Sequence, residues 1–133
     1  MGVAENIAAV RSFYAAGPPQ DDAKRHAFAT PDIVWHVPGQ NPVAGCYQGH
    51  AAVFGEIGQR MQPLDDWTIE VRAVMGNADM VVAVVDLVAA RGRHRVACTA
   101  AHAFRFDAEG RIAETWGFVD DQAKLDALFS DMT

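Results

Sequence analysis

The chain has few of the features that mark a nucleic-acid-binding, membrane or secreted protein. Its 133 residues include 11 Lys and Arg against 17 Asp and Glu, a formal net charge of −6. A basic face able to neutralise phosphates is therefore missing, which argues against a nucleic-acid partner. No apolar run reaches the roughly 20 residues that span a bilayer. The N-terminus has no charged-then-apolar signal pattern. We expect a cytoplasmic protein with no membrane partner.

Cysteine is also scarce, and the usual cofactor motifs are missing. Cys46 and Cys98 have neither the spacing of a metal site nor a secretory context. The chain contains no phosphate loop, nucleotide fingerprint, nucleophile elbow or His-x-x-x-His pair. We therefore predict no cofactor and no bound metal.

What the chain does have is the composition of one ordinary globular domain spanning residues 1–133, with 50% hydrophobic residues. Apolar periodicity and turn signals predict three helices, a short strand, four long strands and a last helix. Their expected ranges are 3–15, 21–28 and 53–61 for the first helices, 33–37, 67–75, 80–90, 94–106 and 111–119 for the strands, and a final helix from residue 120. Helices before sheet indicate an α+β fold, in which a curved antiparallel sheet wraps around helices on one face.

The predicted strand 80–90 points to a second subunit. Residues 80–85 (MVVAVV) are apolar on both faces of the strand, so both faces should be covered. The helices can cover one face, and little of the chain remains for the other. We expect a homodimer through the sheet.

Two histidines in apolar strands are the first candidates for chemistry. His36 ends a short apolar run, just before a loop rich in Pro and Gly. His102 shares a strand face with small or apolar residues, where an imidazole is desolvated and needs a partner. If both face one cavity, they form the wall of a ligand pocket; otherwise each is a hydrogen-bonded core or edge histidine.

Two aspartates join them as candidate catalytic residues. Asp86 interrupts an apolar strand, so it either takes part in catalysis or pairs with a neighbour such as Arg95. Asp120 either caps the last helix or closes the mouth of the pocket. By residue type alone, the two histidines and Asp86 could form a two-His-one-carboxylate metal site, but their spacing in the sequence does not favour one.

Aromatic side chains are the candidate ligand-binding residues. Phe13 and Tyr14 are adjacent on the first helix, so only one is expected to point squarely inward. The others could line an aromatic cavity or belong to the core; they are Trp35, Tyr47, Phe54, Trp67, Phe104, Trp116 and Phe118.

The layout resembles the nuclear transport factor 2-like, or cystatin-like, fold, and within it the SnoaL-like polyketide cyclases and the ketosteroid isomerases. The resemblance covers nearly the whole chain, and its most specific parts are residues 34–49, 102–110 and 116–121. It implies a cone-shaped α+β barrel. It also implies proton-transfer chemistry, because ketosteroid isomerase pairs an Asp base with a Tyr and a protonated Asp that stabilise an oxyanion.

The resemblance places this chain's residues at the isomerase positions with substitutions. His36 falls at the position of the base, His102 at that of the protonated Asp, and Phe13 nearest the Tyr, with Tyr14 one residue out of phase. The expected function is proton transfer on an apolar, carbonyl-bearing small molecule, an isomerisation or an aldol-type cyclisation, without a cofactor. The alternatives are a binding domain without turnover, and an epoxide hydrolase, which needs an Arg between two carboxylates inside the pocket.

Overall fold

The computed structural model describes residues 2–15 and 26–130. Most of the helix expected over 21–28 lies outside the described residues. The elements, in chain order, are α1 (Val3–Ala15), β1 (Ala29–Val37), β2 (Gly45–Gln48), the π-helix η2 (Ala52–Glu56), α3 (Ile57–Arg60), β3 (Asp66–Gly76), β4 (Met80–Arg91), β5 (His94–Phe106), β6 (Ile112–Val119) and α4 (Gln122–Phe129). The predicted α+β class is confirmed, as are the first helix, the four long strands and the last helix.

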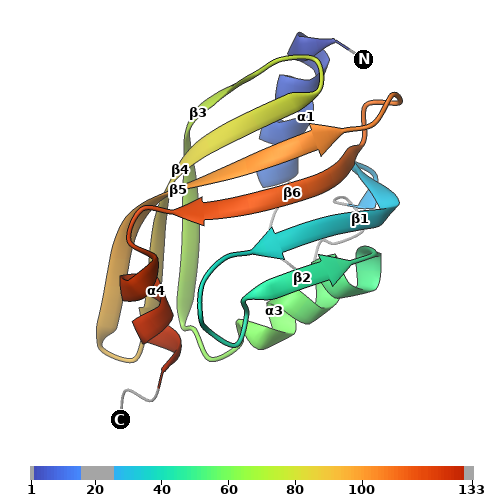
Figure 1. The fold of residues 1–133 in the computed structure, drawn as a ribbon. Coiled ribbons are helices and arrows are strands. Elements are labelled where there is room, and N and C mark those ends of the chain that lie inside the picture. The colour runs from blue at the N-terminus through green and yellow to red at the C-terminus, as the bar shows by residue number, and fades with distance from the viewer. Residues whose placement is uncertain (1, 16–25, 131–133) are drawn as a thin grey trace.

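Six strands form one strongly curved sheet in the order β2-β1-β6-β5-β4-β3 (Figure 1). The strands β3 to β6 make the predicted antiparallel meander. The sheet is mixed, however, because β1 pairs parallel with β6. A register shift between Val71 and Ala73 in β3 adds to the curvature.

The segment after β1, expected to be loop throughout, contains the short strand β2. It pairs antiparallel with β1, so that His36 lies opposite Cys46 and Trp35 opposite Tyr47. The Pro- and Gly-rich residues 38–44 are the connection between the two strands. This pairing gives β1 a neighbour on each side and fixes which of its residues face inward.

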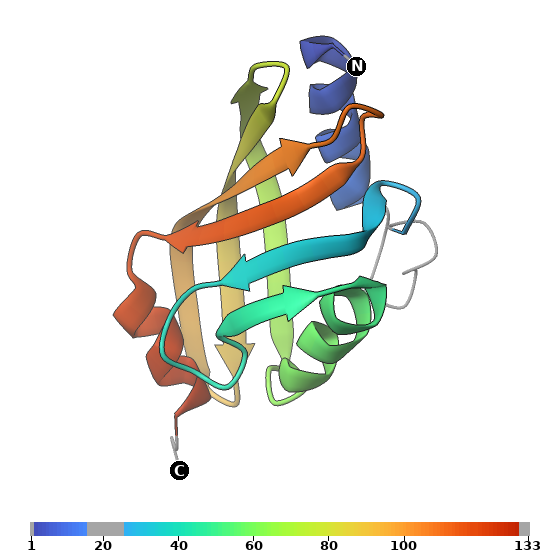
Figure 2. The same ribbon diagram turned by 45° about the vertical axis from the view of Figure 1, so that its right-hand side comes forward.

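The core lies between the inner face of the sheet and α1 (Figure 2). On α1 the buried residues are Asn6, Val10 and Phe13, at helical spacing. Val10 and Phe13 form one buried cluster with alternate residues of β4 and β5, including Val85 and Phe104, which are both 0% exposed. The period-2 pattern of β4 thus places one set of valines in the core and leaves the other set on the outer face.

The third predicted helix is present at nearly its expected position, but its first part is the π-helix η2, which continues directly into α3. Glycines inside a predicted helix suggest a close approach to a neighbouring element, and Gly55 and Gly58 lie in this segment. That expectation is wrong, since a Cβ added at either glycine would meet nothing within 4 Å. Both glycines line a cavity instead.

Candidate functional site

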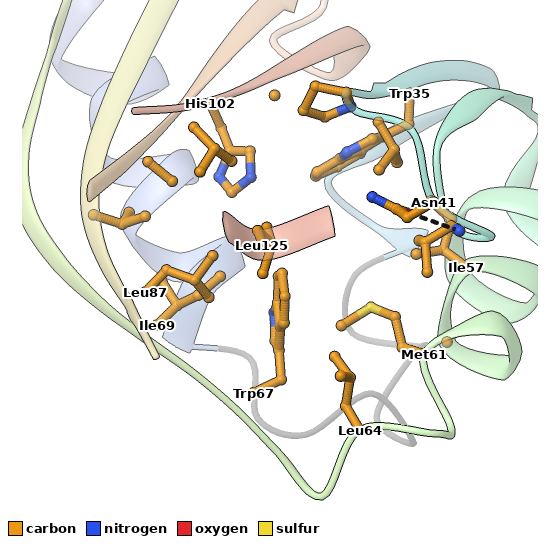
Figure 3. Close-up of a pocket in the computed structure, with 18 of the residues that line it drawn as sticks. Trp35, Asn41, Ile57, Met61, Leu64, Trp67, Ile69, Leu87, His102 and Leu125 are labelled. Carbon is orange, nitrogen blue, oxygen red and sulfur yellow. Dashed lines mark hydrogen bonds between the residues drawn. The ribbon is translucent and has the colours of Figure 1, made fainter. Parts of the chain in front are cut away.

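A cavity of about 930 Å³ lies between the inner face of the sheet, α1, η2–α3 and α4 (Figure 3). Most of its wall is aliphatic or aromatic, as ligand pockets usually are. Figure 3 shows His102 and Trp35 at one end and Leu64 and Trp67 at the other. The cavity therefore has two distinct ends with an apolar middle.

One hydrogen-bonded pair of polar side chains lies on this wall. The Tyr14 hydroxyl, from α1, is hydrogen-bonded to Nδ1 of His102, from β5, and both residues line the cavity. Nε2 of His102 has no hydrogen-bond partner among the described residues. The imidazole thus has one nitrogen held by Tyr14 and the other free for a ligand.

Burial keeps both members of this pair neutral. It lowers the pKa of His102 from 6.5 to about 4, and it raises the pKa of the Tyr14 hydroxyl far above its usual 10.0. At pH 7 the pair therefore holds a neutral imidazole and a neutral phenol. Two tautomers are open to it: either the phenol donates to Nδ1 and Nε2 carries the N–H, or Nδ1–H donates to the phenol oxygen and Nε2 carries a lone pair.

The position of His102 follows from strand alternation. It lies on the inner face of β5 with Ala100 and Phe104, as predicted, and its partner across the ladder is Gly117 of β6. A Cβ at Gly117 would stand 3.0 Å from Cδ of Pro38 and 3.6 Å from Cδ2 of His102. A glycine at this position therefore lets the 38–44 loop approach the imidazole.

The loop itself is anchored to α4 by Asp126. The carboxylate accepts hydrogen bonds from Gln40 N (2.9 Å), Asn41 Nδ2 (2.7 Å) and Gln122 Nε2 (2.8 Å). Partial burial raises the pKa of Asp126, but these three hydrogen bonds outweigh it and hold that pKa below its usual value. Asn41 Oδ1 accepts from the backbone of Val43 and Ala44 and so closes the turn.

The structure does not bring His36 to this cavity. Strand alternation turns Trp35 and Val37 inward, and both line the cavity, whereas the His36 ring lies on the outer face. There it stacks on Trp116 at 5.5 Å, and its Nε2 lies 2.6 Å from Oε2 of Glu114. The hydrogen bond from His36 lowers the pKa of Glu114, against a smaller opposing effect of burial. The expectation that the two strand histidines share a pocket is wrong.

Both candidate aspartates also lie outside the cavity. Asp86 is on the outer face of β4 and forms an ion pair with Arg72 of β3. The alternative prediction, that Asp86 pairs with a neighbouring residue, is therefore the correct one, although the partner is Arg72 and not Arg95. Asp120 accepts a hydrogen bond from Thr99 N at 3.2 Å. The cap of α4 is Asp121, whose side chain accepts from Lys124 N.

The predicted aromatic residues divide between cavity, core and surface. The cavity is lined by the predicted aromatic residues Phe13, Tyr14, Trp35, Phe54 and Trp67, and also by Phe118, which remains 58% exposed. Both Phe13 and Tyr14 face it, contrary to the expectation that only one would.

The remaining predicted ligand-binding aromatics are not on the cavity wall. Tyr47 is buried, with its hydroxyl donating to Val43 O at 2.5 Å, and Phe104 is in the core at 0% exposure. Trp116 is on the outer face. Strand alternation turns Trp116 outward, whereas Phe104 faces inward like His102 but is covered by its ring contacts with Phe13 and Trp35.

Several cavity residues were not assigned from the sequence. Asn41 and Gln122 are polar residues of the wall, brought together by Asp126. The 38–44 loop and α4 meet through tertiary contacts that no local pattern shows.

Within residues 2–15 and 26–130, no three His, Cys, Asp or Glu side chains gather closely enough to hold a metal ion. Over the same residues no helix has the length and apolar character needed to cross a membrane. Among the described residues of the wall none is an arginine or a lysine.

The fold and the site together define a small α+β domain whose curved sheet encloses an apolar pocket with one neutral Tyr–His pair. The model of the SnoaL-like domain matches residues 10–115, and the chain belongs to this family. No curated protein matches the chain.

Solved structures resemble the whole chain. Bal32a, from a soil-derived mobile gene cassette, has a TM-score of 0.85 at 23% identity, with 96% of this chain and 98% of that one covered. An NTF2-like protein of Burkholderia xenovorans LB400 has a TM-score of 0.85 at 21% identity, with 98% and 99% covered. A protein described as a SnoaL-like polyketide cyclase, from Jannaschia sp. CCS1, has a TM-score of 0.77 at 15% identity, with 96% and 94% covered. At these identities the likeness establishes the fold alone.

Proposed function

We propose that the chain is a cofactor-independent enzyme that moves a proton on an apolar, carbonyl-bearing small molecule, in an isomerisation or an aldol-type cyclisation. The observation that carries this proposal is the neutral, hydrogen-bonded Tyr14–His102 pair on the wall of an apolar cavity. Membership of the SnoaL-like family supports a small-molecule function in general terms. The fold hosts several activities, so the chemistry is argued from the site.

The pair can convert a ketone into its enol without creating net charge. A C–H bond next to the carbonyl breaks and its proton goes to Nε2 of His102. The proton on Nδ1 passes to the Tyr14 oxygen, and the Tyr14 hydroxyl proton passes to the carbonyl oxygen. Burial disfavours both imidazolium and phenolate here, so a relay that avoids both ions suits the site.

The relay is tested by following exchange of α-protons for deuterium in a panel of aryl methyl ketones, by NMR in D₂O. Wild-type protein is expected to accelerate exchange over buffer. His102→Ala and Tyr14→Phe should each lose at least about tenfold, because positioned acid–base groups typically contribute about 10²–10⁴-fold. Exchange at the buffer rate with wild-type protein across the panel would contradict the proposal.

A binding domain without turnover is the second candidate. It is favoured by the low pKa of His102, which makes this imidazole a weak base, and by the position of the two aspartates of the wall. Asp65 and Asp66 flank the end with Leu64 and Trp67, away from His102. For a pure binder, ligand affinity should survive His102→Ala and no α-proton exchange should occur. The epoxide hydrolase alternative needs an arginine between two carboxylates, and the part of the wall that the structure describes carries no arginine.

The outer face of the sheet suggests the partner. Half-buried or exposed residues of three adjacent strands form an apolar area, called here the outer patch: Val82, Val84, Ala101, Ala103, Trp116 and Phe118. The ion pairs Arg72–Asp86 and Arg105–Glu114 flank it at opposite ends. A two-fold axis that lies in the interface and runs across the strands would place each ion pair against the other one of a second copy, so that arginine can meet carboxylate. We propose a homodimer through this patch.

A further inference from the structure

The far end of the cavity is formed by Trp67, which differs from the other two tryptophans of the chain. Trp35 stacks on Phe13 at 5.9 Å and meets the His102 ring edge-on, and Trp116 stacks on His36. The side chain of Trp67 has no ring contact and no hydrogen bond with any described residue. Its indole N–H is thus a donor without a protein acceptor in the described part of the chain.

Strand pairing directs this indole into the cavity. Trp67 lies on the inner face of β3 opposite Ala89, a small residue that is 0% exposed, so there is room above the strand. Figure 3 shows the ring rising from the end near Leu64 toward Leu125, at a distance from His102. Trp67 remains 38% exposed, which is high for so large an apolar side chain.

We infer that Trp67 determines specificity by donating its indole N–H to a second hydrogen-bond acceptor of the ligand, at the end opposite the carbonyl that binds at the Tyr14–His102 pair. An apolar ligand that covered the indole without an acceptor would strip water from the N–H and leave it unpaired. The ligand class is therefore narrower than a simple ketone: an apolar molecule with acceptors, such as two carbonyl groups, at both ends. The inference rests on the proposed function only for the position of the first carbonyl, at the Tyr14–His102 pair.

The test compares three probes of one shape by isothermal titration calorimetry: 4,4′-diacetylbiphenyl, 4-acetylbiphenyl, and 4-acetyl-4′-isopropylbiphenyl, in which an apolar group replaces the second carbonyl. Wild-type protein is expected to bind the diketone about tenfold more tightly than either monoketone. Trp67→Phe keeps an aromatic ring but removes the N–H, so it should abolish this preference and leave monoketone affinity within twofold. Trp116→Phe is the matched control and should keep the preference.

A wild-type protein without the preference, or a Trp67→Phe variant that retains it, would overturn the inference. The proposed enzymatic function can fail independently of this inference. A diketone preference that depends on Trp67, with no α-proton exchange in any probe, would support the role of Trp67 and contradict the proposed proton transfer. Circular dichroism of Trp67→Phe checks that the sheet is intact.

Discussion

At the residue scale, His102 and Tyr14 depend on each other for their hydrogen bonding and on the cavity for their charge state. Each is placed by the regular geometry of its element, an inward position on β5 and a helical position next to the buried stripe of α1. Their side chains meet across 88 positions of sequence. The contact gives a neutral donor–acceptor pair in place of an ionised base.

The low pKa of His102 makes folding stability depend on pH. Because burial lowers the folded-state pKa to about 4 from the usual 6.5, the unfolded chain binds a proton at this residue first as the pH falls. Stability that is complete above pH 6.5 should fall by up to about 3 kcal/mol toward pH 4. Urea unfolding at several pH values measures this. His102→Gln should show a smaller loss over the same window, and the exposed control His94→Gln the full loss. Equal losses in wild type and His102→Gln would refute the assignment.

The sequence correctly predicts that His102 lines the cavity but wrongly predicts the same for His36, and the difference has a physical reason. Both lie in short apolar strands whose alternation defines two faces without saying which one is inside. For His102 the neighbours Ala100 and Phe104 indicate which face is inside, because both are apolar residues of the kind that is buried in a core. For His36, both faces of β1 carry apolar or aromatic residues, and the Glu114 partner that holds it outside lies 78 positions away. Tyr14 was recognised as a candidate, but its partner was not.

At the scale of elements, the 38–44 loop and α4 form one unit through Asp126. The helix begins at the Asp121 cap and presents Leu125 and Leu128 to the core. The opposite side of the same helix receives the loop hydrogen bonds. The strand β1, the loop rich in Pro and Gly that follows it and the last helix were each predictable from turn and cap residues. Their junction was not, because it depends on one carboxylate meeting two distant amides.

Removing the Asp126 carboxylate should loosen this junction. Asp126→Ala leaves three donors without their acceptor and is expected to lower the free energy of unfolding by about 1–3 kcal/mol. The effect should shrink as the pH falls below 3.8, since a carboxyl with a lowered pKa contributes stability above its unfolded pKa and loses it on protonation. Urea titration at pH 7 and pH 3 checks both points. The exposed substitution Lys124→Ala on the same helix is the control, and a change of less than about 0.5 kcal/mol in Asp126→Ala would argue against the anchor.

At the scale of the whole molecule, the two faces of the sheet have different surroundings. Its inner face closes the cavity, and its outer face carries the outer patch with an ion pair at each end. The apolar character of residues 80–85 on both faces, visible in the sequence, is explained by this division. The parallel pairing of β1 with β6 and the short strand β2 were not predictable, because they join segments that are far apart in the chain.

If the outer patch is a dimer interface, sedimentation at micromolar concentration should give about twice the 14.4 kDa chain mass. Ala101→Arg places a charge at the centre of the patch and should give a folded monomer, because a buried unpaired charge is costly. Ala108→Arg, in an exposed turn, should remain a dimer. A wild-type monomer under these conditions would exclude the interface.

The central claim is that proton transfer belongs to the Tyr14–His102 pair and not to the outer histidine. The most direct measurement is the rate of α-proton exchange of an aryl methyl ketone with His102→Gln and His36→Gln side by side. We predict that His102→Gln loses at least about tenfold of the wild-type rate, whereas His36→Gln stays within about twofold. Loss of exchange in His36→Gln with full exchange in His102→Gln would contradict the account.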